Sequence, residues 1–334
     1  MSERVQHDVL PKHSEVCRFC GSGELFLLPG VECGAPTRFA FADLDSVCTY
    51  FCCHCGVAGS YPLPEKVAVE EFYNSTYRSS SGLQRGYPLL DFEAMERQRF
   101  RFEYMYELLE SEGLGEEFRK ILTHGKKLNV LDIGCYTGEA LRAMSEVYGA
   151  EVYGFELDDW AIKYGSLING IEISKLSADD VEFTSFKMGT NFVMMLHVLE
   201  HVRDPRGLLD KINQVLTRNG GYLYVEVPNY EKDISYEFPH LTHFTASSLS
   251  GLCANCGFEV IAIRERGTDL IVLLGIASSR RPVKKIDSQV SRRKFFLKRR
   301  VMTLFYRFLK IARLFQSNLE ILKIVARYFS RHFF

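Results

Sequence analysis

The chain has 334 residues, of which 46% are hydrophobic and 25% charged, so it is long enough for one sizeable core with accessory modules. A polar N-terminus argues against a signal peptide, and the strongest apolar run, Leu270–Ala277, is too short to span a bilayer. We therefore expect a cytoplasmic globular protein.

The net charge of −1 hides a strong asymmetry between the end of the chain and the rest. Residues 291–334 carry twelve basic residues and one acidic residue, a net charge of +11, whereas the other 290 residues sum to −12. The body of the protein should repel polyanions, and the tail should attract them.

Seven of the ten cysteines precede residue 56, in a chain too large for a disulfide scaffold, which favours metal binding. Two CxxC pairs, each followed by glycine, predict a structural Zn²⁺ site with four thiolate ligands. The ligands are Cys17, Cys20, Cys52 and Cys55. One alternative is that Cys53 or His54 replaces Cys52 as a ligand. The other is that the cysteines stay reduced and are buried as small hydrophobic residues.

Residues 63–125 read as a helical connector. Residues 64–73 predict a short helix, residues 77–82 a polar loop, and Asp91 the cap of a longer helix that packs on the following sheet. The apolar positions of that longer helix are Phe92, Met95, Phe102, Met105 and Leu109.

From residue 128 strands alternate with helices, which predicts an α/β fold with a doubly wound, parallel, seven-stranded sheet. The expected strands are 128–134, 151–157, 171–177, 191–197, 221–228, 258–265 and 269–277; the expected helices are 138–149, 158–170, 204–220 and 245–257. Ligands of such sheets bind at the carboxyl ends of the strands. Cys253 and Cys256 fall in the last helix and are expected to serve packing.

The turn after the first of these strands, LDIGCYTGEAL, is built for a ligand without phosphates. It has Gly134 and Gly138 but neither the third glycine of a dinucleotide site nor the Gly-Lys-Ser/Thr of a P-loop. If Tyr136 has a negative φ, we expect the turn to survive, with the ring either covering the edge of a ligand or lying at the surface.

Residues 128–278 resemble class I S-adenosylmethionine-dependent methyltransferases through LDIGCYTGEAL, EVYGFELDDWAI, NFVMMLHVLEHVRDP and GGYLYVEVPN. The resemblance implies that Glu156 binds the ribose hydroxyls and that the segment around Asp179 approaches the adenine. The full cofactor set is Tyr77, Asp132, Gly134, Cys135, Gly138, Glu156, Leu157, Asp179 and His197. Tyr136 departs from the glycine common in the family.

The cysteine pairs, EEFYNSTYRSSSG and the core together resemble sugar C-methyltransferases of deoxysugar and glycan pathways. This implies that Tyr77 lies over the cofactor and that His240, in FPHLTHFT, acts as a general base or acid. Pro239 replaces the glutamate often found before this histidine, and Glu237 is a candidate substitute. The alternative for His240 is a structural hydrogen bond.

The stretch LHVLEHV adds His197, Glu200 and His201 after the fourth strand. We assign His240, His201 and Glu200 as catalytic residues lining the substrate pocket. Metal binding and simple polarity at a helix start are the alternatives, and the order HVLEH does not match the HExxH of zinc proteases.

The tail combines an apolar and a basic helical face after a polar linker. We expect contact with an anionic membrane surface, against the alternatives of packing on the acidic domain or on another subunit; nucleic acid is the least favoured partner. The apolar face is Leu297, Val301, Leu304, Phe305, Phe308, Ile311, Ala312 and Phe315.

The sequence thus predicts a zinc-binding module (1–62), a helical connector or lid (63–125), a methyltransferase core (126–279) and a basic amphipathic tail (280–334). The expected function is methylation, at carbon or oxygen, of a sugar, nucleotide-sugar or lipid-linked glycan intermediate, with peripheral attachment to the inner face of the membrane. An RNA methyltransferase and a non-catalytic scaffold are the alternatives.

Overall fold

The computed structural model describes residues 16–28, 48–61, 63–71, 92–123, 127–232 and 240–276. Tyr77, Asp91, Glu237, Pro239 and the basic tail lie outside these residues, so the expectations attached to them stay predictions. Within the described ranges, no helix is both long and apolar enough to cross a membrane.

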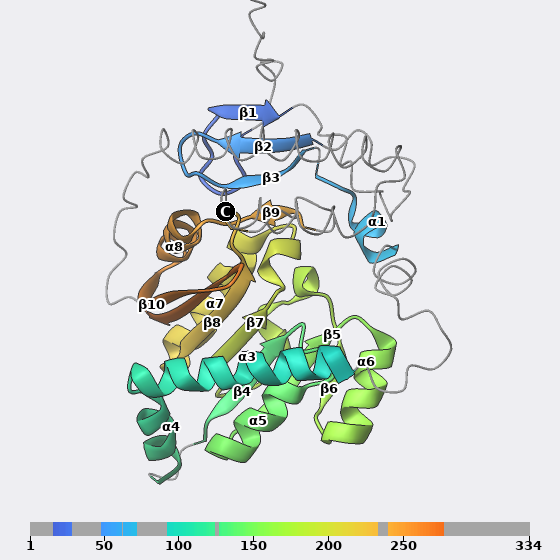
Figure 1. Ribbon diagram of the computed structural model, residues 1–334, viewed down its shortest axis with the longest axis vertical. Helices are drawn as coiled ribbons and strands as arrows, with labels where there is room; N and C mark the ends of the chain where they lie inside the picture. The colour runs from blue at the N-terminus through green and yellow to red at the C-terminus, as the bar shows by residue number, and fades with distance from the viewer. Residues whose placement is uncertain are drawn as a thin grey trace, which may run out of the picture.

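A seven-stranded sheet forms the centre of the protein, in the order β10-β11-β8-β7-β4-β5-β6 (Figure 1). Its strands are β4 (Asn129–Ile133), β5 (Glu151–Glu156), β6 (Ile173–Lys175), β7 (Phe192–Leu196), β8 (Tyr222–Pro228), β10 (Phe258–Arg266) and β11 (Asp269–Ile276). The five strands from β6 to β8 are parallel, which confirms the predicted Rossmann-like architecture.

The last strand, β11, differs from the prediction of a wholly parallel sheet. β11 is antiparallel to both β10 and β8, because it follows β10 through the turn at Gly267 and Thr268. A parallel connection needs a crossover of a dozen or more residues, and two residues allow only a hairpin. The hairpin brings Asp269 opposite Pro228, at the carboxyl end of β8.

Helices cover both faces of this sheet, which explains why its strands are apolar runs instead of alternating patterns. One face packs against α3 (Phe92–Ser111), α4 (Leu114–Thr123) and α5 (Glu139–Tyr148), and the other against α7 (Pro205–Asn219) and α8 (Ala246–Asn255). Neighbouring residues of a strand serve opposite faces: on β4, Val130 packs on the first side and Leu131 on the second.

Helix α3 bears out the expected core positions wherever its side chains are described: Phe102, Met105 and Leu109 are buried against the sheet. Helix α6 (Asp159–Tyr164) follows β5 and continues into a π-helical turn, Gly165–Asn169. Cys253 and Cys256 are fully buried in and after α8, which confirms their packing role.

A second sheet of four strands, in the order β1-β2-β3-β9, was not anticipated. The N-terminal segment supplies β1 (Leu25–Leu28), β2 (Cys48–Cys52) and β3 (Ala58–Tyr61), followed by α1 (Lys66–Glu71). The fourth strand, β9 (Thr242–His243), comes from the chain after β8 and pairs with β3. Figure 1 shows β9 at the edge of this sheet that faces the large one.

Candidate functional site

The turn between β4 and α5 is a tight backbone curl at the carboxyl end of the central strand. Gly134 and Gly138 have φ values of 75° and 81°, in the left-handed region. A Cβ on Gly134 would lie 2.3 Å from a methyl group of Val198, so only glycine fits there. The N–H groups of Gly134 and Cys135 both donate to the carbonyl of Phe155, at 2.8 and 3.0 Å, which ties the curl to β5.

Tyr136 adopts a φ of 51°, and not the negative φ on which the survival of the turn was expected to depend. Its N–H donates to Oε2 of Glu156 at 2.8 Å, and this charge-assisted hydrogen bond offsets a left-handed strain of about 1–2 kcal/mol. Its ring lies against Trp160, with ring centroids 6.1 Å apart. The turn therefore keeps the shape usual for glycine at this position.

Replacing Tyr136 by glycine or by alanine distinguishes the effect of backbone strain on stability from the effect of the ring contact with Trp160. Both variants lose the contact with Trp160, but only glycine relieves the left-handed strain, so Tyr136→Gly should exceed Tyr136→Ala in free energy of unfolding by about 1 kcal/mol. Urea unfolding measures the difference. Equal stabilities would show that the turn is unstrained.

Glu156, at the tip of β5, is oriented by three backbone N–H groups. Besides Tyr136, Leu157 and Asp158 donate to its carboxylate at 2.7 and 3.0 Å. A carboxylate held in this way is pre-organised to accept further hydrogen bonds from a ligand, such as the two hydroxyls of a ribose.

Asp132 is an unusual group for the end of a buried strand. It is 1% exposed, and its Oδ1 has no hydrogen-bond partner within the described residues. Burial, followed by the charge of Glu156, raises the pKa of Asp132 well above its ordinary value. Two carboxylates around one turn fit a ligand that brings positive charge, and S-adenosylmethionine carries both a sulfonium and an ammonium group.

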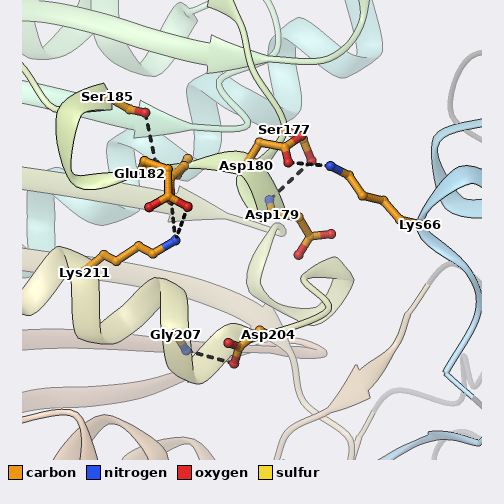
Figure 2. A network of polar contacts seen from close by, with 10 residues as sticks. Lys66, Ser177, Asp179, Asp180, Glu182, Ser185, Asp204, Gly207 and Lys211 are labelled. Atoms are coloured by element: carbon orange, nitrogen blue, oxygen red, sulfur yellow. Dashed lines mark hydrogen bonds and ion pairs between the residues drawn. The ribbon is translucent and has the colours of Figure 1, made fainter.

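Asp179 lies in the connection between β6 and β7, where the adenine is expected. Its Oδ1 accepts the N–H of Arg203 at 2.8 Å, and burial raises the pKa of Asp179. Two ion pairs hold this connection on either side: Lys66 of α1 with Asp180, and Lys211 of α7 with Glu182 (Figure 2).

His197 follows β7 with a φ of 58° and lies among three carboxylates. Its Nε2 is 3.2 Å from Glu226 Oε1 and 3.6 Å from Asp269 Oδ1, and its Nδ1 is 3.4 Å from Glu200 Oε1. Burial would lower the pKa of His197, but the carboxylates raise it well above its ordinary value. The three carboxylates therefore favour the protonated form of this imidazole.

The charged residues around His197 include three that sequence reasoning missed. Glu226 is fully buried on β8 and pairs with Arg101 of α3, Nε to Oε1, at 3.0 Å, while Asp269 begins β11. A glutamate inside the apolar run YLYVEVP was a readable signal, since a charge in a buried strand needs a partner. Its partner Arg101 is distant in sequence and had no signal of its own.

Glu200, His201 and His240 meet beside this group. Glu200 and His201 belong to the 3₁₀ turn Leu199–His201, and the N–H of Leu241 donates to the carbonyl of Glu200 at 2.8 Å, which brings His240 to that turn. The rings of His201 and His240 lie 4.9 Å apart between centroids. Thus the histidine pair forms between His201 and His240, and not between His197 and His201 on one helical face.

The four predicted cysteine ligands converge in the N-terminal sheet. The Sγ atoms of Cys17 and Cys55 are 3.6 Å apart, those of Cys20 and Cys52 3.5 Å, and all four lie within 4.8 Å of one another. Four thiolates at ~2.3 Å from Zn²⁺ would lie ~3.8 Å apart, so the spacing fits the ion. Cys53 and His54 are not part of this group.

The cysteine sheet also holds the backbone that carries His240. Arg18, between two of the cysteines, donates to the carbonyl of Leu241 at 3.0 Å, and the Ser60 hydroxyl donates to that of His240 at 3.3 Å. A side chain on Gly59 would meet the Leu241 carbonyl at 3.0 Å, so glycine permits this close approach.

Comparison with known proteins connects these features to one family. A family model described as a methyltransferase domain matches residues 97–263, half of the chain. No curated protein matches.

Several solved structures are similar at low identity. One is a SAM-dependent methyltransferase from Aquifex aeolicus (18% identity, TM-score 0.38, covering 48% of this chain and 89% of that one). Another is a complex of the Haloferax volcanii Trm112 methyltransferase activator with a methyltransferase (14%, 0.41, 53% and 97%). A third is the N-terminal domain of EvdMO1 with SAH bound (17%, 0.37, 49% and 80%). Similarity at this level carries no argument about substrate.

Proposed function

This chain belongs to the methyltransferase-domain family. We propose that it uses S-adenosylmethionine to methylate a small, sugar-like molecule: a sugar, a nucleotide-sugar or a lipid-linked glycan intermediate. The observation that carries the proposal is the neighbourhood of two groups at one edge of the sheet. The acidic turn of Asp132 and Glu156 suits a cationic cofactor, and the histidine cluster beside it suits removal of a proton.

Binding of the cofactor is assigned to the turn and to the strand ends around it. Glu156 would accept the ribose hydroxyls, Asp132 would face the positive charge of the methionine part, and Leu157 and Asp179 would border the adenine. Gly134, Cys135, Gly138 and His197 complete the proposed contacts, together with Tyr77. The bound cofactor supplies an electrophilic methyl group on sulfur.

His240 is the proposed base in the cluster of Glu200, His201 and His240, when no metal ion is bound there. Its ring lies beside that of His201, and Nε2 of His201 is 3.6 Å from Oε1 of Glu200. Although burial would raise it, the neighbouring histidines lower the pKa of Glu200 to about 2, which favours its carboxylate form beside the two rings. An acceptor proton taken by His240 would leave the oxygen or carbon free to attack the methyl group.

The cysteine group is proposed to hold one structural Zn²⁺ ion, because four protein ligands leave no open position for catalysis. The basic tail is proposed to contact an anionic membrane surface, where lipid-linked acceptors would lie. Both proposals can be tested without knowledge of the acceptor, by metal analysis and by vesicle sedimentation.

Cofactor calorimetry and an acceptor screen test the function. Titration of the full chain with S-adenosylmethionine should give saturable heat. Labelled methyl should then appear on sugar nucleotides or glycan intermediates and not on ribosomal RNA. Saturable binding with transfer only to RNA would overturn the sugar assignment, and the absence of binding would overturn the cofactor assignment.

Glu156→Ala should weaken binding of S-adenosylmethionine by ~10–100-fold, since charge-assisted hydrogen bonds contribute about 1.5–3 kcal/mol. Calorimetry gives the dissociation constant, and thermal unfolding shows whether the turn is intact. Glu151→Ala is the matched control: it removes a glutamate from the other end of β5, where the partner is the exposed Lys127. An unaltered constant for Glu156→Ala would refute the ribose contact.

A further inference from the structure

Glu200 has an environment that the proposed function does not explain. Its side chain is 1% exposed, and neither carboxylate oxygen has a hydrogen-bond partner among the described residues. The imidazoles of His197 and His201 approach Oε1 only at 3.4 and 3.6 Å, without hydrogen-bond geometry. A buried carboxyl group whose two oxygens accept no hydrogen bond is costly, and a cation bound directly to these oxygens is the simplest explanation.

Two imidazoles converge on this carboxylate from different parts of the chain. One ligating atom each from Glu200, His201 and His240 lies within 4.8 Å of the others. Bonds of ~2.1 Å to a tetrahedral ion would bring these atoms to ~3.4 Å from one another, a change within the reach of side-chain rotation. The backbone is already fixed by the hydrogen bond from Leu241 N to Glu200 O, at 2.8 Å.

We propose that Glu200, His201 and His240 form a binding site for a divalent transition-metal ion, for which Zn²⁺ is the best chemical match. Two imidazoles and one carboxylate are ligands that Zn²⁺ and its neighbours prefer over Mg²⁺ or Ca²⁺, which favour oxygen. The charge of the ion would satisfy the buried carboxylate. Three protein ligands leave one position open, unlike the four-cysteine group.

A second group of potential ligands, His197, Glu226 and Asp269, is a weaker candidate. It contains one imidazole instead of two, and the guanidinium of Arg101 already neutralises Glu226 at 3.0 Å. A cation entering there would be repelled by Arg101. If the ion binds at Glu200, His201 and His240, substitution of Glu200 should weaken metal binding and substitution of Asp269 should not. The reverse holds if the ion binds at His197, Glu226 and Asp269.

Metal binding would regulate the proposed reaction. This consequence rests on the proposed function, but the existence of the metal site does not depend on it. A coordinated imidazole has no lone pair left for a proton, so His240 can act as a ligand or as a base but not as both. A bound ion would therefore switch off the base without touching the cofactor turn.

Cobalt titration of the full chain, with zinc retained on the cysteines, tests the site. Co²⁺ gives visible absorption that reports its ligands, and metal analysis gives the number of ions per chain. We expect one Co²⁺ ion beyond the cysteine-bound zinc, with a spectrum lacking thiolate bands. Glu200→Gln and His240→Ala should each weaken this Co²⁺ binding by more than ~10-fold, the lower bound for loss of even an outer-shell partner.

Asp269→Asn is the matched control and should leave the Co²⁺ affinity unchanged. Wild-type protein that binds no ion beyond the cysteine site would overturn the proposal, whatever the variants do, and so would loss of binding in Asp269→Asn alone. Calorimetry with S-adenosylmethionine on the same sample keeps the two proposals apart, because absent cofactor binding would refute the proposed function and leave the cobalt result standing.

Discussion

Cys52→Ser is expected to abolish binding of the zinc ion proposed for the cysteine group and to unfold the four-stranded sheet. Structural zinc sites contribute apparent binding free energies of about 10–16 kcal/mol in small peptides, so loss of one of four thiolates should remove several kcal/mol of stability from this segment. Because β9 is the last strand of the same sheet, the backbone next to His240 should become mobile as well. The core between the large sheet and α3, α4 and α5 includes no described residue of the N-terminal segment, so the large sheet should remain folded.

Metal analysis, thermal unfolding and amide hydrogen exchange check this expectation. Zinc content should fall from one ion per chain to none, and exchange should rise in β1, β2, β3 and β9 while β4 and β5 stay protected. Cys53→Ser is the matched control, since Cys53 lies in the same cysteine pair segment but outside the group of four. Full zinc content in Cys52→Ser, or loss of zinc in Cys53→Ser, would contradict the ligand assignment.

His240→Ala is expected to reduce methyl transfer by ~10²-fold or more while leaving the affinity for S-adenosylmethionine unchanged. Cofactor affinity should persist because none of the proposed cofactor contacts lies on the segment between β8 and α8 that carries His240. Ser60 and Arg18 hold the backbone of His240 and Leu241 in place. Turnover should fall because the other described histidine of this segment, His243, is buried and cannot replace His240 as the base.

Transfer of labelled methyl to the acceptor found in the screen measures turnover, and calorimetry measures cofactor affinity. His54→Ala, which removes an exposed histidine from the cysteine segment, is the control and should behave as wild type. The pH profile adds a second readout: the limb attributed to the base should disappear in His240→Ala. Unchanged turnover would remove His240 from the mechanism.

Local patterns were sufficient for most of the large sheet. Strands such as Phe192–Leu196 are buried on both faces, so their apolar runs stand out between the helical repeats and the glycines that end them. The turn of Gly134 and Gly138 was equally readable, because both glycines have a left-handed φ and lie only four residues apart. The four cysteine ligands were also readable, since their spacing alone limits the partners.

Other features depended on contacts between residues far apart in the chain. The antiparallel direction of β11 follows from a two-residue turn whose neighbours look like any buried strand. The fourth strand of the small sheet is two residues long, and nothing in Thr242 or His243 by themselves indicates pairing with Ala58 and Gly59.

For the candidate site too, the sequence indicated several of the residues, but only the folded chain showed which of them lie together. The spacing of LHVLEHV after an apolar strand singled out Glu200 and His201, whereas the resemblance to methyltransferases implied roles for Glu156 and His240. Their grouping needed the folded chain: the Leu241–Glu200 hydrogen bond joins His240 to His201, and helix α3 brings Arg101 to Glu226. Such pairings arise from electrostatic and hydrogen-bond contacts across elements, which have no periodic trace in the order of residues.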